Sequence, residues 1–295
     1  MTKVLVAGAT GYLGNFIVEE LARRSIATKA IARTPERLRT AGADQLEVVK
    51  AEVTQRETLR GLLEDVDTVI SSVGITRQRD GLSYDQVDYQ ANLNLLREAL
   101  AGNVQKFIYV SVFNGKAMRD LEICKAKERF VDELKSSGLA FVVIRPNGFF
   151  SDMASFVEMA RKGRVYIFGD GHFRSNPIHG ADLAKVCVDA IELGAEEIEV
   201  GGPDTLSQKQ IAALAFEAVG NNDVSITKIP DILRRAALVV AKWLTPRTVY
   251  GPLQFFLTVL ARDMLAPETG ERRLADFFEQ EAKRGRDEAA GSLRS

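Results

Sequence analysis

The sequence predicts an α/β protein in which a doubly wound parallel sheet is joined to a smaller, mainly helical C-terminal lobe. Short β-rich runs alternate with longer helical patterns through the first half of the chain, as in right-handed βαβ units. A glycine-rich turn at residues 8–14 connects the first of these runs to the first helical pattern. The 295 residues are 46% hydrophobic and 27% charged, a balance that supports a packed core and excludes a disordered chain.

Six strands are expected in the first 145 residues, each followed by a helical segment or a turn. The expected strands are 3–7, 27–32, 46–50, 68–72, 106–111 and 141–145. The helical patterns between them are 16–24, a polar helix from about 35, 57–63, 83–101 and 124–136. This alternation matches a doubly wound sheet, and Pro146 ends the sixth strand because proline cannot donate a backbone hydrogen bond.

The second half of the chain is less regular. Helical patterns are expected at 151–162, 182–193 and 207–219, and short strands at 165–168 and 197–200. We therefore divide the chain into a sheet core at 1–145, a second lobe at 146–278 and a charged tail at 279–295. Within the second lobe, the segment 178–200 is expected to return to the core.

The strongest motif is GATGYLG, which places glycines at positions 8, 11 and 14 between the first strand and the first helix. Glycines there let the chain turn with a positive φ and approach a pyrophosphate without a Cβ clash. The helix that follows directs unpaired N–H groups and its positive dipole end at the phosphates. The motif therefore predicts a Rossmann dinucleotide site, with the loop residues Gly8, Thr10, Gly11, Tyr12, Leu13 and Gly14 binding the cofactor.

The residues after the second strand decide which dinucleotide is expected. A carboxylate there binds the ribose hydroxyls of NAD, whereas an arginine pairs with the 2′-phosphate of NADP. This chain has Arg33 at that position with Thr34 beside it, and its next acidic residue is Glu36. The sequence favours NADP over NAD, the alternative being that Arg33 is a solvated arginine at the start of a helix.

Two further strand ends supply candidate cofactor contacts. Glu52 and Val53 follow the third strand, where the adenine ring is expected, although Val53 is equally well explained as core packing. Ser72, Val73 and Gly74 follow the fourth strand, where the chain would pass the ribose on the nicotinamide side. These positions rest on the strand order alone.

Several stretches together resemble the atypical short-chain dehydrogenase/reductases, in particular their NmrA-like and divinyl-chlorophyllide-reductase-like branch of NAD(P)H-binding proteins. The stretches are GATGYLG, VSVFNG, KAKERFVDELKSSGLAFVVIRPNGFF, PIHGADLAKV and, more loosely, APETGERRLADFF. The resemblance implies that the nicotinamide lies over the C-terminal edge of the sheet and that the second lobe shapes the substrate pocket. It also implies that Pro146 and Asn147 border the nicotinamide.

The chain departs from that family at the catalytic tyrosine, which usually stands four residues before a lysine and donates a proton. For Lys125 the tyrosine position holds Leu121, and for Lys127 it holds Ile123, so neither pair supplies the acid. We favour Lys125 as the lysine that binds the ribose and takes part in the chemistry. The alternative for both lysines is an exposed helix charge.

Ser111 matches the position of the family's catalytic serine and is expected to polarise a carbonyl, or alternatively to cap a loop. Asn114 is a weaker polar candidate. The context of Cys124 gives no indication of thiolate chemistry, and we expect His179 to be structural.

Composition excludes several other classes of protein. The chain has two cysteines and two histidines, so neither a disulfide framework nor a metal site is expected. A net charge of −1 gives no sign of nucleic-acid binding. The sequence shows no secretory leader and no apolar run of about 18 residues, so we expect a soluble, cytoplasmic protein.

The segment 228–263 combines apolar helical patterns at 232–244 and 253–260 with a net charge of +4, which leaves −5 for the rest of the chain. Trp243 stands at the border of its apolar and polar positions. This pattern fits peripheral contact with an anionic membrane. It also fits a lid over an apolar substrate, a homodimer face, or simple packing against the core.

The function predicted from these observations is NADPH-dependent reduction of an apolar or aromatic small molecule, such as a quinone, an enone or a tetrapyrrole-like compound. Ser111 and Lys125 would polarise the acceptor. The missing tyrosine keeps a second hypothesis open, a non-catalytic NAD(P)H-binding sensor or assembly factor. A third, nucleotide-sugar epimerase or dehydratase chemistry, is disfavoured because that chemistry generally uses the absent tyrosine–lysine pair.

Overall fold

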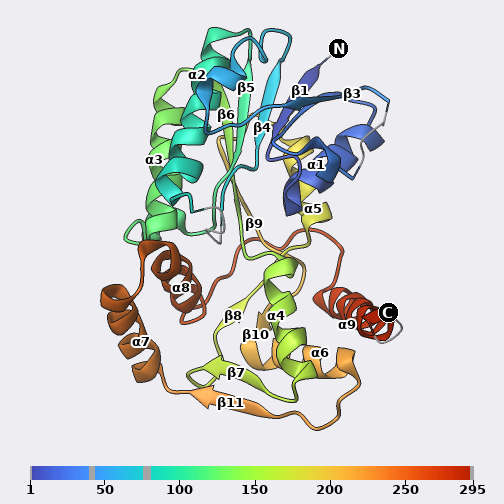
Figure 1. Ribbon diagram of the computed structural model, residues 1–295, viewed down its shortest axis with the longest axis vertical. Helices are drawn as coiled ribbons and strands as arrows, with labels where there is room; N and C mark the ends of the chain where they lie inside the picture. Colours follow the sequence, from blue (N-terminus) through green and yellow to red (C-terminus); the bar gives the residue numbers. More distant parts are fainter. Residues whose placement is uncertain (1, 40–43, 76–80, 293–295) are drawn as a thin grey trace. The chain divides into compact units, whose positions relative to one another are not determined.

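The computed structural model describes residues 2–39, 44–75 and 81–292, which form two compact units (Figure 1). The first unit comprises Met1–Pro146, Gly180–Glu199 and Pro246–Phe255. The second comprises Asn147–His179, Val200–Thr245 and Phe256–Ser295.

A seven-stranded sheet with the order β3-β2-β1-β4-β5-β6-β9 forms the centre of the first unit. Its strands are β1 (Lys3–Ala7), β2 (Ala27–Ala32), β3 (Leu46–Lys50), β4 (Thr68–Ser71), β5 (Lys106–Val110), β6 (Ala140–Pro146) and β9 (Glu197–Val200). The pairings β2–β3, β1–β2, β1–β4, β4–β5 and β5–β6 are all parallel. The strand order reverses between β1 and β4, and a crevice is expected there outside the carboxyl ends of the strands. The predicted doubly wound fold is confirmed.

Helices cover both faces of this sheet, as its mostly apolar strands require. Helices α2 (Asn92–Ala101) and α3 (Glu122–Ser136) lie on one face, whereas α1 (Tyr12–Arg23) and α5 (Gly180–Asp189) pack together on the other (Figure 1). The core between the sheet and the first pair includes the buried rings of Phe107, Tyr109 and Phe130.

Three predicted helical segments of the first unit are shorter or more irregular than expected. The pattern at 57–63 forms only a 3₁₀ turn at Arg56–Leu59, because Gly61 follows with a φ of +74°. The polar helix expected from residue 35 is a single 3₁₀ turn at Pro35–Arg37. The segment 83–101 begins with a π-helical stretch at Asp85–Ala91 before α2, and a further 3₁₀ turn lies at Gly115–Met118.

The second unit packs three helices around its own apolar core. These are α4 (Phe150–Arg161), α6 (Gln208–Val219) and α9 (Leu274–Ser292), with Phe150, Phe216 and Phe278 buried between them. Two small sheets join them: β7 (Val165–Phe168) is parallel to β11 (Ile226–Ile229), and β8 (Arg174–Ser175) is antiparallel to β10 (Leu206–Ser207).

Most of the predicted charged tail at 279–295 is helical. Helix α9 continues to Ser292, and its residue Ala282 is buried in the core of the second unit, which explains why the helix does not end at 278. Residues 293–295 of that prediction lie outside the described residues.

The basic apolar segment forms two helices, α7 (Asp231–Leu244) and α8 (Arg247–Val259). Neither of these, nor any other helix within residues 2–39, 44–75 and 81–292, is long and apolar enough to span a membrane.

Candidate functional site

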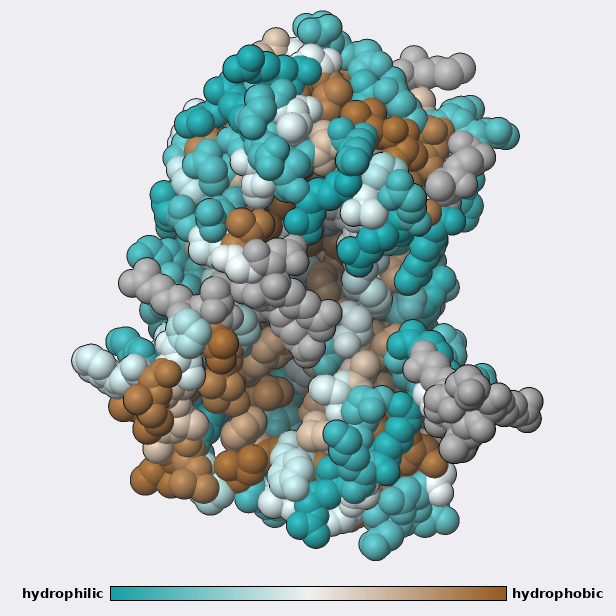
Figure 2. All heavy atoms as spheres, viewed as in Figure 1, coloured by the Kyte–Doolittle hydropathy of each residue, from teal (hydrophilic) through white to brown (hydrophobic). Residues whose placement is uncertain are grey.

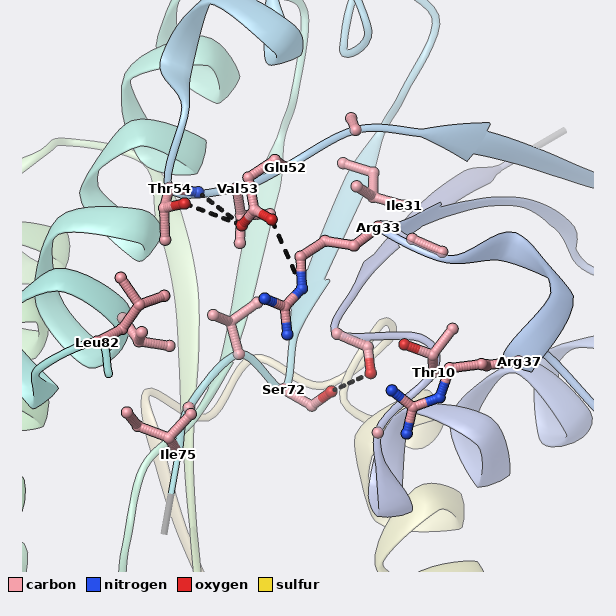
Figure 3. Close-up of a pocket in the computed structure, with 17 residues that line it drawn as sticks. Thr10, Ile31, Arg33, Arg37, Glu52, Val53, Thr54, Ser72, Ile75 and Leu82 are labelled. Carbon is pink, nitrogen blue, oxygen red and sulfur yellow. Dashed lines mark hydrogen bonds and ion pairs between the residues drawn. The ribbon is translucent and has the colours of Figure 1, made fainter. Parts of the chain in front are cut away.

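A pocket of about 320 Å³ lies at the carboxyl ends of β1 to β4, within the first unit (Figure 3). Its walls come from the loops that follow these strands and from two residues further along the chain. Nine of the predicted cofactor-binding residues line it: Gly8, Thr10, Gly11, Arg33, Glu52, Val53, Ser72, Val73 and Gly74. The pocket therefore brings together most of the site that the strand order predicts.

The glycine loop forms the floor of this pocket. Gly8 has a φ of +82°, and a Cβ on it would lie 2.8 Å from Ser72 Oγ and 3.1 Å from the Ser72 carbonyl carbon. The Gly11 N–H donates to the Gly8 carbonyl at 2.9 Å, and helix α1 begins at the next residue. An anion above the loop can therefore approach the backbone closely at the positive end of a helix, which fits the pyrophosphate of a dinucleotide.

The remaining predicted loop residues hold the helix in place and do not line the pocket. Leu13 is buried, and the Tyr12 hydroxyl accepts a hydrogen bond from the Gly180 N–H at 3.2 Å. A Cβ on Gly14 would lie 2.0 Å from the Gly8 carbonyl oxygen, so glycine is needed there for close packing of α1 on the loop. Thr34 is exposed and also lies outside the lining.

Two arginines flank the mouth of the pocket. Arg33 reaches over it and forms an ion pair with Glu52, with 3.5 Å between Nε and Oε2, while Glu52 Oε1 accepts a 2.9 Å hydrogen bond from Thr54 Oγ1 (Figure 3). Arg37 approaches from the side of Thr10 and also lines the pocket. Sequence reasoning missed Arg37, although a second basic residue four positions after Arg33 was a usable signal for a phosphate partner.

Replacing both arginines by alanine is expected to weaken NADPH binding about 10- to 100-fold, because charge-assisted contacts to the 2′-phosphate contribute about 1.5–3 kcal/mol. NADH has no 2′-phosphate, so its affinity is expected to change less than about threefold, far below one charge-assisted contact. Titrations of Arg33→Ala/Arg37→Ala with the two nucleotides measure this. An equal loss for both would contradict the assigned role.

Part of the pocket wall is apolar. Ile31, Val53, Ile75, Leu82 and Val87 line it, and Val53 also packs against the core of the first unit. Both interpretations of Val53 therefore apply, since it is core on one side and pocket wall on the other. Ile75 and Leu82 were missed, because nothing in their sequence context distinguishes them from ordinary core residues.

A buried ion pair lies directly behind Gly74. Lys127 of α3 and Asp88 are 3.0 Å apart between Nζ and Oδ1, and Asp88 is fully buried. A Cβ on Gly74 would lie 2.7 Å from that carboxylate oxygen and 2.8 Å from that amine, so both groups abut the backbone that lines the pocket. Lys127 Nζ also lies 5.5 Å from the ring centroid of Tyr109.

The charge of this pair follows from opposing effects. Burial lowers the pKa of the Lys127 amine, but Tyr109 and Asp88 raise it, and the net direction is upward. Burial raises the pKa of the Asp88 carboxyl, against the effect of Lys127. The lysine is therefore held as a charged ammonium at the edge of the sheet.

Lys125, the lysine that the sequence favoured, lies on the exposed side of the same helix. Residues 125 and 127 of a helix project about 200° apart, so only one of them can face the sheet. The structure places the Lys127 side chain there, beside Asp88 and Gly74, and leaves Lys125 exposed.

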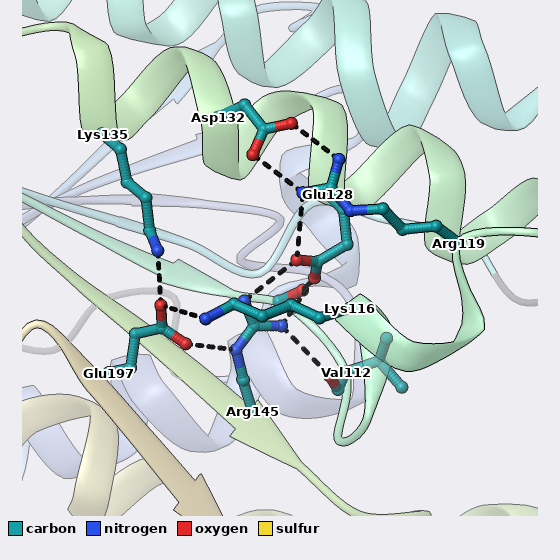
Figure 4. Close-up of polar contacts among 9 residues, drawn as sticks. Val112, Lys116, Arg119, Glu128, Asp132, Lys135, Arg145 and Glu197 are labelled. Carbon is teal, nitrogen blue, oxygen red and sulfur yellow. Dashed lines mark hydrogen bonds and ion pairs between the residues drawn. The ribbon is translucent and has the colours of Figure 1, made fainter.

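Ser111 is buried at the end of β5, and its hydroxyl donates to Glu128 Oε1 at 3.1 Å. Glu128 also forms a two-pronged ion pair with Arg145, at 2.6 and 3.0 Å (Figure 4). Arg145 Nε in turn contacts Glu197 Oε2 at 2.8 Å. The Ser111 hydroxyl thus belongs to a buried polar network that ties β5, α3, β6 and β9 together.

The Arg145→Met variant is expected to lower the free energy of unfolding by about 3–5 kcal/mol, because it leaves the Glu128 carboxylate buried without its partner. Urea denaturation measures the loss. The double variant Arg145→Met/Glu128→Met removes both charges and is expected to recover most of it. A double variant as unstable as the single one would show that the loss of unfolding free energy comes from altered packing and not from the unpaired Glu128 carboxylate.

The two residues at the end of β6 that the resemblance placed beside the nicotinamide, Pro146 and Asn147, have different environments. Pro146 is the last residue of β6 and is buried in the first unit. Asn147 belongs to the second unit, where its amide donates to Asn176 Oδ1 at 2.7 Å and to the Met264 carbonyl at 2.6 Å. Its carboxamide therefore holds together three segments of that unit.

The remaining candidates show ordinary structural roles. Burial raises the pKa of the Cys124 thiol to about 12, which keeps it protonated at neutral pH. The His179 ring packs against Phe150 and Phe277 within the second unit. Asn114 has a φ of +55° at the turn before Gly115–Met118. The described residues contain no group of three or more His, Cys, Asp or Glu side chains arranged to hold a metal.

Comparison with known proteins agrees with the geometry of the pocket. Residues 8–193 match the family model described as NAD(P)H-binding. Divinyl chlorophyllide a 8-vinyl-reductase of Oryza sativa subsp. indica is 31% identical, over 92% of this chain and 73% of that protein. The photosystem II assembly factor Ycf39 of Guillardia theta is 26% identical, over 82% of this chain and 76% of that protein.

The same fold occurs in leucoanthocyanidin reductase from Vitis vinifera, solved as its binary complex with NADPH. That structure superposes with a TM-score of 0.74 at 19% identity, over 95% of this chain and 99% of the other. The family match spans the glycine loop, the arginines and the buried lysine, and the predicted binding of NAD(P)H is confirmed at the level of the family. The chain belongs to the NAD(P)H-binding family of proteins.

Proposed function

We propose that this protein is an NADPH-dependent reductase that saturates a carbon–carbon double bond conjugated to a large, planar tetrapyrrole. The observation that carries the reductase assignment is the Lys127 ammonium held by Asp88 against Gly74, at the edge of the nucleotide pocket. The substrate class is supported by the similarity to the rice vinyl-reductase.

The pocket residues fit the cofactor by their chemistry. The glycine loop would bind the pyrophosphate, Arg33 and Arg37 the 2′-phosphate, and the apolar wall the adenine. NADPH, when bound, supplies the hydride for the reduction. The residues of the pocket would orient the bound NADPH, and Lys127 would keep a positive charge at the edge of the sheet.

Lys127 would act as an electrostatic group. A permanently charged ammonium in a site of low dielectric constant stabilises negative charge that develops on an acceptor as it is reduced. Its raised pKa makes it a weak acid, so the proton that completes the saturated product would come from solvent. This role requires no tyrosine at position 123.

A pH profile tests the charged state of Lys127. Because the pKa of the amine is raised above its ordinary value of 10.5, it stays protonated throughout the neutral range. We expect kcat to show no ionisation of this group between about pH 6 and 9, which lies more than a unit below the ordinary lysine pKa. A loss of kcat as the pH rises through that range would indicate that the amine titrates there and would contradict the assignment.

Incubation of the purified protein with NADPH and divinyl chlorophyllide a tests the proposed function. The expected result is one 8-ethyl product formed for each NADPH oxidised, measured by chromatography and by absorbance of the reduced nicotinamide. A quinone and a simple enone serve as alternative acceptors. Oxidation with either of these and none with the tetrapyrrole would keep the reductase assignment and overturn the substrate.

The similarity to Ycf39 favours a second candidate, a nucleotide-binding assembly factor without turnover. This candidate predicts that NADPH binds in the pocket but is oxidised by none of the three acceptors. The same incubation therefore separates the two candidates.

A further inference from the structure

Helix α7 presents an unusually apolar surface to solvent. Its only buried residue is Ala241, although half of its 14 residues are large and apolar. The most exposed apolar side chains are Trp243 at 83%, Leu244 at 78% and Ile232 at 73%, followed by Val239, Leu233 and Val240. Figure 2 shows hydrophobic colouring gathered over this helix, at the lower left of the view.

These side chains share one face of the helix. At 100° per residue, the six exposed apolar positions fall within an arc of about 140°, and the half-buried Leu238 lies outside it. The buried Ala241 and half-buried Arg234 lie on the opposite side, where Arg234 Nη1 donates to the Leu257 carbonyl at 3.2 Å. Helix α7 therefore contacts its own unit through the side that carries Ala241 and Arg234, and its apolar face stays exposed to solvent.

Basic side chains border this face. Arg235 and Lys242 are exposed at neighbouring angles on one flank of the apolar arc. Asp231 is the acidic residue of the helix, and it is already paired with Arg234 and Arg235 at 2.6 Å each. The surrounding segment 228–263 has a net charge of +4 in a chain whose total is −1.

The apolar face and its basic flank together indicate what kind of partner could cover α7. A second copy docked through the same face would bring the basic flanks of both chains together, and the acidic residue of the helix, Asp231, is already paired within its own chain, so the contact is unfavourable. The 14-residue helix is about 21 Å long, too short to cross a hydrocarbon core of about 30 Å. An anionic lipid surface satisfies both features, because acyl chains cover the apolar arc and headgroup phosphates meet the basic flank.

We propose that α7 lies in the plane of an anionic membrane surface, with Trp243 and Leu244 inserted at the level of the upper acyl chains. Such a surface would concentrate the protein where strongly apolar molecules partition. The proposal stands independently of the reductase assignment, since it rests on α7 and on the charge of the segment 228–263 around it.

Trp243 is the single tryptophan of the chain, so its emission reports on this helix without labelling. The protein is titrated with phosphatidylcholine vesicles that contain about one third phosphatidylglycerol, and with vesicles of phosphatidylcholine alone. The expected results are a blue shift with the anionic vesicles, quenching by brominated acyl chains, and affinity at least about tenfold weaker without the anionic lipid, as electrostatic attraction to the surface requires. High salt is expected to weaken binding in the same way.

Two double variants separate the contributions that the apolar face and the basic flank of α7 make to vesicle binding. Val240→Glu/Leu244→Glu places charges on the apolar face, and Arg235→Glu/Lys242→Glu reverses the basic flank while Trp243 stays in place as reporter. Each is expected to weaken vesicle binding at least about tenfold, because each removes one of the two signals that anchoring needs. The control Arg60→Glu/Arg97→Glu makes the same charge change at two exposed sites in the first unit and is expected to bind like the parent.

Circular dichroism and thermal melting establish that each variant is folded before it is compared. Absence of a spectral shift with anionic vesicles, or equal binding by all the variants, would overturn the proposal. An emission shift that depends on protein concentration without vesicles would assign the face to a second copy and would overturn it as well.

Discussion

The Lys127→Met variant is expected to lower kcat for NADPH-dependent reduction by about 10²- to 10³-fold, the usual loss when one preorganised charge-stabilising group is removed. The Kd for NADPH is expected to change much less, because the glycine loop and the two arginines remain. Methionine keeps much of the length of the side chain and removes its charge. Steady-state rates and a separate nucleotide titration measure the two quantities.

Two companion variants make this result specific. Lys125→Met removes the exposed lysine two residues earlier on the same helix and is expected to keep kcat within about twofold, as surface changes far from a site usually do. Lys127→Met/Asp88→Asn removes the carboxylate that the single variant leaves unpaired, so it is expected to regain stability without regaining kcat. Loss of rate in Lys125→Met and retention in Lys127→Met would return the role to Lys125.

The fold was predictable because its signals are local and repeated. The strands at 3–7, 27–32 and 46–50 have the bounds that the sequence predicts, since each is a short β-rich run with a distinct local pattern. The departures occur where a tertiary contact overrides the local pattern. Helix α9 continues past 278 because Phe278 and Ala282 are covered by α4 and α6, which a charged composition alone does not reveal.

The pocket lining was predictable where it depends on the backbone or on the order of the strands. The glycine loop follows from spacing, because a positive φ and close approach require glycine at Gly8. The choice between Lys125 and Lys127 depends on which side of α3 faces the sheet, and Asp88 comes from a π-helical stretch 39 residues earlier. A contact between such distant segments has no signature in a single sequence.

Gly8→Ala is expected to weaken NADPH binding at least about 50-fold, equivalent to roughly 2.3 kcal/mol. Two effects combine at this position. A φ of +82° is costly for any residue with a Cβ, and that Cβ would lie 2.8 Å from Ser72 Oγ and 3.1–3.2 Å from the Ser72 backbone. The loop must therefore move, and its N–H groups no longer point at the pyrophosphate. Fluorescence of the bound reduced nicotinamide measures the affinity.

Gly138→Ala provides the matched control, because Gly138 has a φ of +77° and no atom within 4 Å of the added Cβ. It carries similar backbone strain without the collision, so it is expected to lower the melting temperature and leave the Kd for NADPH unchanged.

Ser72→Gly combined with Gly8→Ala removes the hydroxyl from the collision but keeps the backbone contacts, so only partial recovery of binding is expected. Parental affinity in Gly8→Ala would mean that the loop does not hold the phosphates. Equal losses in Gly8→Ala and Gly138→Ala would attribute the effect to stability, since Gly138 lies outside the pocket.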